Sequence, residues 1–152
     1  MKGVRVGSEL EHVAIILGEP SPDPDSDKQL SRHGYYDANW IDAHIEIAAG
    51  GFRGYYRASL FRADFPDFRD ALKKLYSFAS NQGEFCTIEN QLHIAIRGDR
   101  RGNFEARCIA KDSDDGNCLE FKIQFDQTYI PRMLTELDAI IAAYPVLCKA
   151  GV

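Results

Sequence analysis

Two histidines with nearby arginines are the residues whose types and spacing suggest chemistry. His44 and His93 fall on the polar sides of strand-like segments, and the expected strand pairings bring Arg57 near His44 and Arg107 near His93. Imidazoles exchange protons near neutral pH, so these groups could cleave a phosphodiester by general acid–base catalysis. This hypothesis requires the two hairpins to be adjacent. The alternative is that both are ordinary outward-facing histidines of charged strands.

Two acidic segments could bind a partner. Asp112, Asp114 and Asp115 lie in a polar segment that resembles a calcium loop, but Gly116 and Ile123 occupy the fifth and twelfth positions, where oxygen ligands are needed. We therefore expect a hydrophilic hairpin turn. The second segment, between Gly18 and Gly34, contains three prolines and carries the acidic residues Asp23, Asp25 and Asp27, which predicts a flexible loop over residues 18–34.

The sequence contains no phosphate loop, dinucleotide fingerprint, nucleophile elbow or metalloprotease motif. It has four scattered cysteines without zinc-type spacing, which we expect to be reduced thiols. We therefore predict no catalytic residue, no cofactor and no metal, and a protein that acts by binding rather than as an enzyme.

Polar residues at the ends of two elements favour a structural role. Asp37, Asn39 and Trp40 precede a strand, and Asp126, Gln127 and Thr128 join a strand to a helix. Side-chain oxygens at such positions commonly satisfy backbone donors. His12 falls in a strand that is apolar on both sides, which favours a hydrogen-bonded core histidine over a ligand.

Period-two alternation predicts the strands that position these residues. The segment 11–17 is apolar throughout, and residues 40–49 and 52–60 alternate around Gly50-Gly51, where a tight turn needs positive φ angles. That turn sets residue 48 opposite 53 and residue 46 opposite 55. Four further strands are predicted, over residues 84–89, 92–96, 104–110 and 119–125.

Two amphipathic helices complete the pattern. The first is expected to begin at a capping Asp64 and to bury Phe65, Phe68, Leu72, Leu75 and Phe78; the second, capped by Thr128, is expected to bury Ile130, Leu134, Leu137, Ile141 and Tyr144. Short connections indicate an α+β fold, with a largely antiparallel sheet of about six to seven strands and both helices on one face. We expect one domain over residues 1–152, with a tail from 146 to 152.

The overall charge and hydropathy restrict the partner and the compartment. The net charge of −5 argues against nucleic acid as a partner and favours a neutral or basic protein. No apolar run approaches the roughly 20 residues of a membrane span, and no secretory signal pattern is present, so we expect a cytoplasmic protein without membrane contact.

Several short motifs, in this order and spacing, resemble the WapI family of bacterial immunity proteins. They cover most of residues 35–146 and comprise Tyr36-Asp37-Ala38-Asn39-Trp40-Ile41, Gly51-Phe52-Arg53-Gly54, Gly98-Asp99, Gly102-Asn103-Phe104-Glu105, Gly116-Asn117-Cys118-Leu119, Asp126-Gln127-Thr128-Tyr129-Ile130-Pro131 and Tyr144-Pro145-Val146. The resemblance implies a protein that binds and neutralises the C-terminal domain of a cognate bacterial toxin, often an RNase. It implies no catalytic residues.

Two other functions compete with toxin neutralisation. One is the phosphoesterase-like enzyme that would use His44 and His93, and the other is a small-ligand or scaffold module on a mixed-charge sheet face. Either acidic segment could meet a toxin by placing carboxylates where a nuclease would bind phosphates, and such pairing would speed association at low salt. The sequence leaves the toxin, the contact surface and the oligomeric state open.

Overall fold

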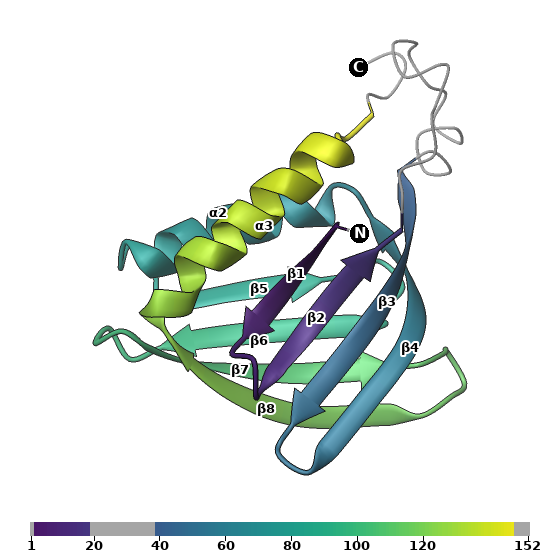
Figure 1. Ribbon diagram of the computed structural model, residues 1–152, viewed down its shortest axis with the longest axis horizontal. Coiled ribbons are helices and arrows are strands. Elements are labelled where there is room, and N and C mark those ends of the chain that lie inside the picture. Colours follow the sequence, from purple (N-terminus) through teal and green to yellow (C-terminus); the bar gives the residue numbers. More distant parts are fainter. Residues whose placement is uncertain (1, 19–38, 148–152) are drawn as a thin grey trace.

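The fold is built from two antiparallel four-stranded sheets and two helices, as seen in a computed structural model that describes residues 2–18 and 39–147 (Figure 1). Each sheet is a meander whose strands follow the chain order. The first sheet contains β1 (Lys2–Gly7), β2 (His12–Leu17), β3 (Trp40–Ala49) and β4 (Phe52–Phe61), and the second contains β5 (Gln82–Cys86), β6 (Leu92–Gly98), β7 (Asn103–Lys111) and β8 (Cys118–Asp126).

The α+β fold class predicted from the sequence is confirmed, with antiparallel strands and two helices packed against them. The strands divide into two sheets rather than one, and β1 lies outside the predicted strands. In Figure 1 the strands of the second sheet run behind and across those of the first. The Pro/Asp segment, with Asp23, Asp25, Asp27 and Asp37, lies outside the described residues.

The predicted β3–β4 hairpin is confirmed in its register. Ala48 pairs with Arg53 and Glu46 with Tyr55, so the alternating apolar residues of both strands share the inner face of the sheet. Gly50 adopts φ +59°, as the first residue of the tight turn requires, whereas Gly51 does not have the positive φ that was predicted for it.

The two helices lie across the edges of the sheets. Helix α2 (Asp64–Tyr76) packs against β5, and α3 (Ile130–Ala143) packs against β1 and against α2; a short 3₁₀ turn, η1 (Gln127–Tyr129), leads from β8 into α3. The guanidinium group of Arg132 donates hydrogen bonds to the carbonyl oxygens of Arg5 (2.9 Å) and Gly7 (2.8 Å). Helix α3 therefore satisfies backbone groups along the outer edge of β1, which would otherwise be an open sheet edge.

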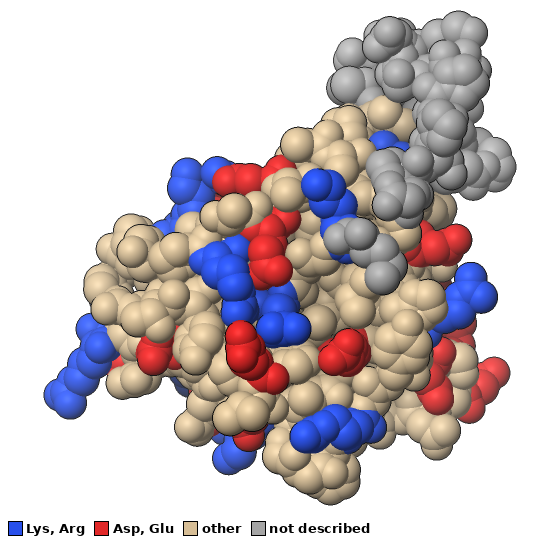
Figure 2. Space-filling view, viewed as in Figure 1, with Lys and Arg blue, Asp and Glu red and all other residues tan. Residues whose placement is uncertain are grey.

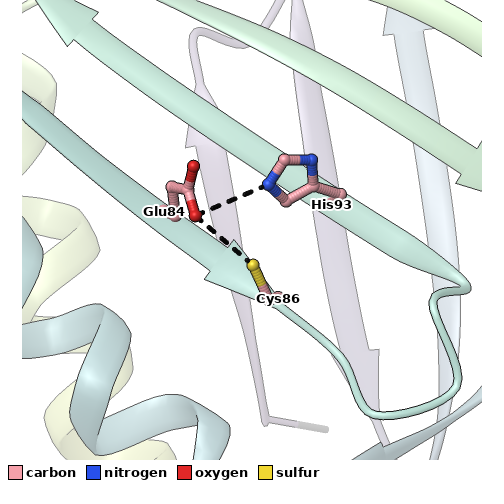
Figure 3. Close-up of side chains that lie close together, drawn as sticks. All are labelled: Glu84, Cys86 and His93. Atoms are coloured by element: carbon pink, nitrogen blue, oxygen red, sulfur yellow. Dashed lines mark hydrogen bonds and ion pairs between the residues drawn. The ribbon is translucent and has the colours of Figure 1, made fainter.

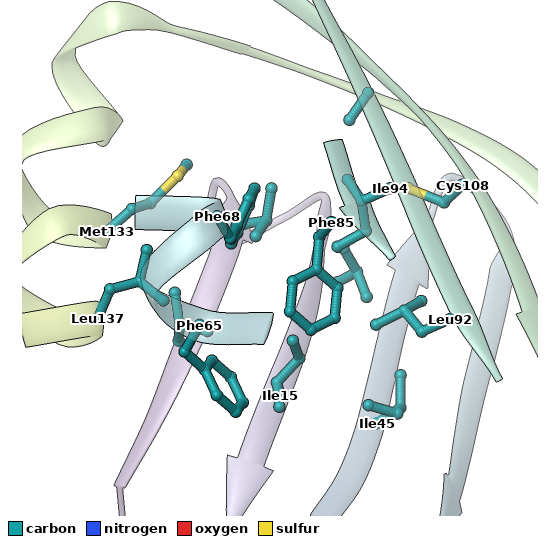
Figure 4. Close-up of a cluster of buried hydrophobic side chains, with 14 of the residues drawn as sticks. Ile15, Ile45, Phe65, Phe68, Phe85, Leu92, Ile94, Cys108, Met133 and Leu137 are labelled. Carbon is teal, nitrogen blue, oxygen red and sulfur yellow. The ribbon is translucent and has the colours of Figure 1, made fainter. Parts of the chain in front are cut away.

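A continuous apolar core fills the space between the sheets and the helices (Figure 4). Phe85 of β5 is 1% exposed and contacts the rings of Phe65 (centroids 5.8 Å apart) and Phe68 (5.2 Å) of α2. Met133 and Leu137 reach the same core from α3, and neither side chain is exposed. The core joins both sheets, so the outward faces of the two sheets point away from it.

The first helix differs from its prediction at both ends. Ala63 occupies the capping position, and the carboxylate of Asp64, the first helical residue, accepts a hydrogen bond from the backbone N–H of Phe61 (3.3 Å). Phe78 lies beyond the helix with φ +60° and is exposed, because the helix ends at Tyr76 and the chain turns away from the core.

The second helix is capped and rotated differently from its prediction. Asp126, not Thr128, caps the turn: its carboxylate accepts a hydrogen bond from the Thr128 backbone N–H (2.8 Å). Helix α3 fully buries Met133 and Ile140, while the predicted Leu134 and Ile141 are only partly buried. The buried stripe is rotated because the helix faces α2 as well as β1.

The β5–β6 turn is linked to strand β4 by Gln91. Its side-chain oxygen accepts a hydrogen bond from the Ser59 backbone N–H (2.8 Å), and its carbonyl oxygen accepts one from the Tyr56 hydroxyl (2.7 Å). The turn of one sheet is thereby held against the edge strand of the other.

Candidate functional site

The two histidines proposed as a catalytic pair lie in different sheets. His44 is on the outward face of β3, opposite Arg57 as predicted, and its ring stacks on Tyr55 at a centroid distance of 5.1 Å. His93 is on the outward face of β6 and pairs with Cys86 and Ile109. The hairpins that carry them are not neighbours in either sheet, so the adjacency that the catalytic hypothesis requires is not found.

The buried histidine has both of its ring nitrogens occupied. His12 is 5% exposed; its Nδ1 lies 3.0 Å from the Ser8 carbonyl oxygen and its Nε2 lies 3.3 Å from the Glu46 carboxylate. These contacts explain how a histidine is accommodated in an apolar strand. The prediction of a hydrogen-bonded core histidine is confirmed.

The outward face of the second sheet carries charges of both signs in pairs. Arg107 donates a hydrogen bond to Glu105 (2.9 Å), and this bond is the main reason that the pKa of the Glu105 carboxyl lies below its ordinary value. Shallow hollows on this face are lined by His93, Arg107, Phe121 and Lys122, among others. Charges neutralised within the face leave it without a strong field of one sign. Figure 2 shows a similar interspersion of basic and acidic side chains over the helices and the first sheet.

The acidic β7–β8 turn lies beside other polar and aromatic residues and forms what we call the acidic hollow. The hollow is lined by Trp40, Ser59, Glu89, Gln91, Asp112, Ser113 and Asp114. The Asp112 carboxylate accepts a hydrogen bond from the Asn117 backbone N–H (2.7 Å), which holds the turn in shape. Glu89 and Asp114 are exposed, so both carboxylates are available to a partner. Asp115 is exposed in the same turn.

The sequence alone does not bring Glu89 into this group. It belongs to the β5–β6 turn, which Gln91 holds against β4, whereas Trp40 begins β3 in the other sheet. The ring of Trp40 packs edge-on against Phe61 with centroids 5.5 Å apart, and the side chain is only partly buried.

The other predicted polar residues form hydrogen bonds with backbone groups, some of them far away in the sequence. Asn39 is completely buried; its amide oxygen accepts a hydrogen bond from the Leu147 N–H (2.9 Å) and its amide nitrogen donates to the Leu147 carbonyl oxygen (3.4 Å). Gln127 donates its backbone N–H to the Gly102 carbonyl oxygen (2.8 Å). The hydrogen bonds from Thr128 are the main cause of the lowered pKa of the Asp126 carboxyl.

Exposed aromatic and aliphatic side chains lie at the hairpin ends of the first sheet. Phe52 and Tyr55 are each 66% exposed, and Leu10 in the β1–β2 turn is 84% exposed. Phe52 falls on the apolar side of the β4 alternation, but it sits beside the turn and is exposed. A shallow hollow here is lined by Leu10, Tyr55 and Arg53, among others. Aromatic and arginine side chains of this kind are frequent in protein interfaces.

Three potential metal ligands meet on the outward face of β5 and β6 (Figure 3). The Glu84 carboxylate oxygen lies 3.6 Å from the Cys86 Sγ and 3.8 Å from the His93 Nε2. The ligand atoms of all three residues lie within 4.8 Å of one another. The sequence signal is weak, because Glu84 and Cys86 alternate on one strand and His93 follows only after a turn. Among the described cysteines, Cys86, Cys108 and Cys118 are all free thiols.

No helix in the described part of the chain is long and apolar enough to cross a bilayer.

Comparisons with known proteins give one family and distant structural likenesses. The model of the immunity protein WapI-like family matches residues 11–145. No curated protein matches the chain. Among solved structures, the Trypanosoma bruciei MRP1/MRP2 structure is 9% identical with a TM-score of 0.47, covering 91% of this chain and 81% of that one. The plant transcriptional regulator PBF-2 is 12% identical with a TM-score of 0.45, covering 93% of this chain and 81% of that one.

Proposed function

The chain belongs to the immunity protein WapI-like family, and on this premise we propose that it binds and neutralises a cognate bacterial toxin domain of the ribonuclease class. The observation that carries the proposal is the family match over residues 11–145, which runs from the start of β2 past the end of α3. Neutralisation of this kind needs only binding, because a protein that covers the active site of a nuclease keeps its substrate out.

The acidic hollow supports this function as a contact surface. Exposed Glu89 and Asp114 come from turns of the second sheet, and Trp40, which lines the same hollow, offers an apolar surface. Tryptophan is among the residues in which interface binding energy concentrates when a partner covers it and excludes water. Ribonuclease sites present Lys and Arg to phosphates, and the two carboxylates offer these cations the same type of acceptor oxygen.

The direct test is copurification of the tagged protein with the toxin encoded beside it. We expect a complex that inhibits the ribonuclease activity and associates more slowly as salt is raised, because electrostatic steering is screened. No complex with any neighbouring toxin candidate would refute the function itself.

Trp40 provides a built-in test of the surface, because it is the single tryptophan of the chain. If the acidic hollow is the contact, its fluorescence changes when a toxin domain without tryptophan binds. Unchanged Trp40 emission in a verified complex would refute the acidic hollow and would direct attention to the hollow at Leu10 and Tyr55.

A charge-neutralised variant measures the electrostatic part. Glu89→Gln with Asp114→Asn leaves Asp112 in place, since that carboxylate holds the turn. Exposed ion pairs contribute little individually, so we expect a loss of about 1 kcal/mol in total, roughly fivefold in Kd. The matched control is Asp67→Asn with Asp70→Asn on the exposed side of α2, which changes the net charge equally. Equal weakening by both pairs would mean that net charge, and not the acidic hollow, governs binding.

A further inference from the structure

We propose that Glu84, Cys86 and His93 form a binding site for a single divalent ion of the zinc class on the outward face of the second sheet. The inference is independent of toxin neutralisation, because it rests on the three side chains alone. It goes beyond the sequence motifs, since none of the spacings between these residues is typical of a zinc site.

The strand pairing creates the geometry. Cys86 of β5 is directly opposite His93 of β6, and Glu84 is two residues before Cys86, so all three side chains project from the same face. Figure 3 shows the Glu84 carboxylate directed toward both the thiol and the imidazole.

The two separations from the Glu84 carboxylate are close to those of tetrahedral coordination. Zinc bonds of the usual lengths place neighbouring ligand atoms about 3.3–3.6 Å apart. The observed separations from the Glu84 oxygen are 3.6 Å to the Cys86 sulfur and 3.8 Å to the His93 nitrogen. Small rotations of the side chains therefore suffice to close the site around an ion.

The strands beneath the site are rigidly held. Phe85 lies between Glu84 and Cys86 in the chain and points the other way, into the core, where it packs on the phenylalanines of α2. The residues on either side of His93, Leu92 and Ile94, are completely buried. The ligand positions are thus fixed by the core before any ion binds, which reduces the entropic cost of binding.

The ligand types select the ion. A thiolate and an imidazole favour zinc and related transition ions over calcium or magnesium, which prefer oxygen. A thiolate and a carboxylate neutralise the two charges of the ion. Without an ion, burial and the adjacent Glu84 carboxylate raise the pKa of the Cys86 thiol, and a bound cation would reverse this by favouring the thiolate.

Three protein ligands leave one coordination position open. Glu84 and Cys86 are exposed, so solvent reaches the site and a water molecule can complete the tetrahedron. Open sites of this kind exchange their fourth ligand, unlike the closed four-ligand sites that stabilise folds. We therefore expect metal binding without a requirement of the metal for folding.

The test is titration of the reduced, full-length protein with Co²⁺, followed by competition with Zn²⁺. We expect one equivalent of Co²⁺ to give tetrahedral visible bands and a thiolate-to-cobalt charge-transfer band, all displaced by Zn²⁺. Cys86→Ser should abolish the charge-transfer band, and Glu84→Gln or His93→Ala should weaken the affinity by at least about tenfold. Cys118→Ser, at the other exposed thiol of the described residues, is the matched control and should behave as the wild type.

Alkylation provides a second readout. Zn²⁺ should protect Cys86 from iodoacetamide, as mapped by peptide mass spectrometry, and should leave Cys118 reactive. Circular dichroism of each metal-free variant establishes that it is folded. Absence of a charge-transfer band in the folded wild type, or its persistence in Cys86→Ser, would overturn the proposal. Equal protection of both thiols would also overturn it.

Discussion

Replacement of Asn39 by alanine tests how the chain end is attached to the fold. Asn39 stands immediately before β3, and its buried amide is hydrogen-bonded to both backbone groups of Leu147, which follows α3. The side chain thus connects two segments that are 108 residues apart in the sequence. In Asn39→Ala, the N–H and the carbonyl oxygen of Leu147 lose these partners inside the protein.

The expected loss of stability follows from these two hydrogen bonds. A buried polar group without a partner costs about 1–3 kcal/mol. The N–H at 2.9 Å loses a good bond, whereas the carbonyl at 3.4 Å loses a long one, which places the sum at about 2–4 kcal/mol. If Leu147 moved into water, its backbone groups would regain hydrogen bonds and the loss of stability would be smaller. This movement would expose the apolar Leu147 side chain, which is now only 7% exposed. We therefore expect a decrease of about 2–3 kcal/mol in the free energy of unfolding, or roughly 5–10 °C in Tm.

Urea unfolding measures the total effect, and hydrogen exchange at the Leu147 amide measures the local one. Asn39→Asp keeps an acceptor for the Leu147 N–H but loses the donor, so its unfolding should also be easier than that of the wild type. Asn117→Ala, in the exposed β7–β8 turn, is the control and should change stability by less than about 0.5 kcal/mol. A loss below about 1 kcal/mol in Asn39→Ala, with unchanged protection of the Leu147 amide, would refute the reasoning.

Three further predictions concern side chains at or near the core. Burial raises the pKa of Asp64 to about 6, so the folded state holds this proton more tightly than the unfolded state and stability falls as pH rises from about 4 to about 6. Asp64→Asn should remove this pH dependence. After allowance for solvent screening, it should raise the free energy of unfolding by roughly 1 kcal/mol above pH 6. Urea unfolding midpoints at pH 4.5 and 7.5 measure the effect. Phe85→Ala should cost about 3–5 kcal/mol in chemical denaturation, because the ring fills the space between α2 and the second sheet. Burial also raises the pKa of Cys108 to about 12. Iodoacetamide should therefore label this thiol only after unfolding, as read by mass spectrometry. Labelling of the native protein at the rate of an exposed thiol would contradict the structure.

Much of the secondary structure follows from local patterns. The alternation around Gly50-Gly51 determines the β3–β4 hairpin to the residue, since a shift of one position would turn every apolar side chain outward. Strand β1 was not predicted, because its alternating signal consists only of Val4 and Val6. Helix α2 buries the predicted Phe65, Phe68 and Leu72 because a spacing of three to four residues leaves a single helical face for the core.

The functional candidates depend far more on contacts between distant segments. The family motifs point to an immunity protein, but they do not place Glu89 beside Asp114 and Trp40. Glu89 and Asp114 belong to two different turns of the second sheet, and Trp40 begins a strand of the first. The same limit applies to His44 and His93, which look equivalent in the sequence and lie in separate sheets.

The sequence by itself determined which residues of the alternating strands and of α2 face inward, since this depends on the period of the backbone and on the avoidance of water by apolar side chains. Only the tertiary structure decided that the strands form two sheets, that α3 turns Met133 and Ile140 rather than Leu134 inward, and that Glu84 meets Cys86 and His93. Sheet order and helix rotation are set by packing between elements far apart in the chain, and no local period encodes which partner an element will meet.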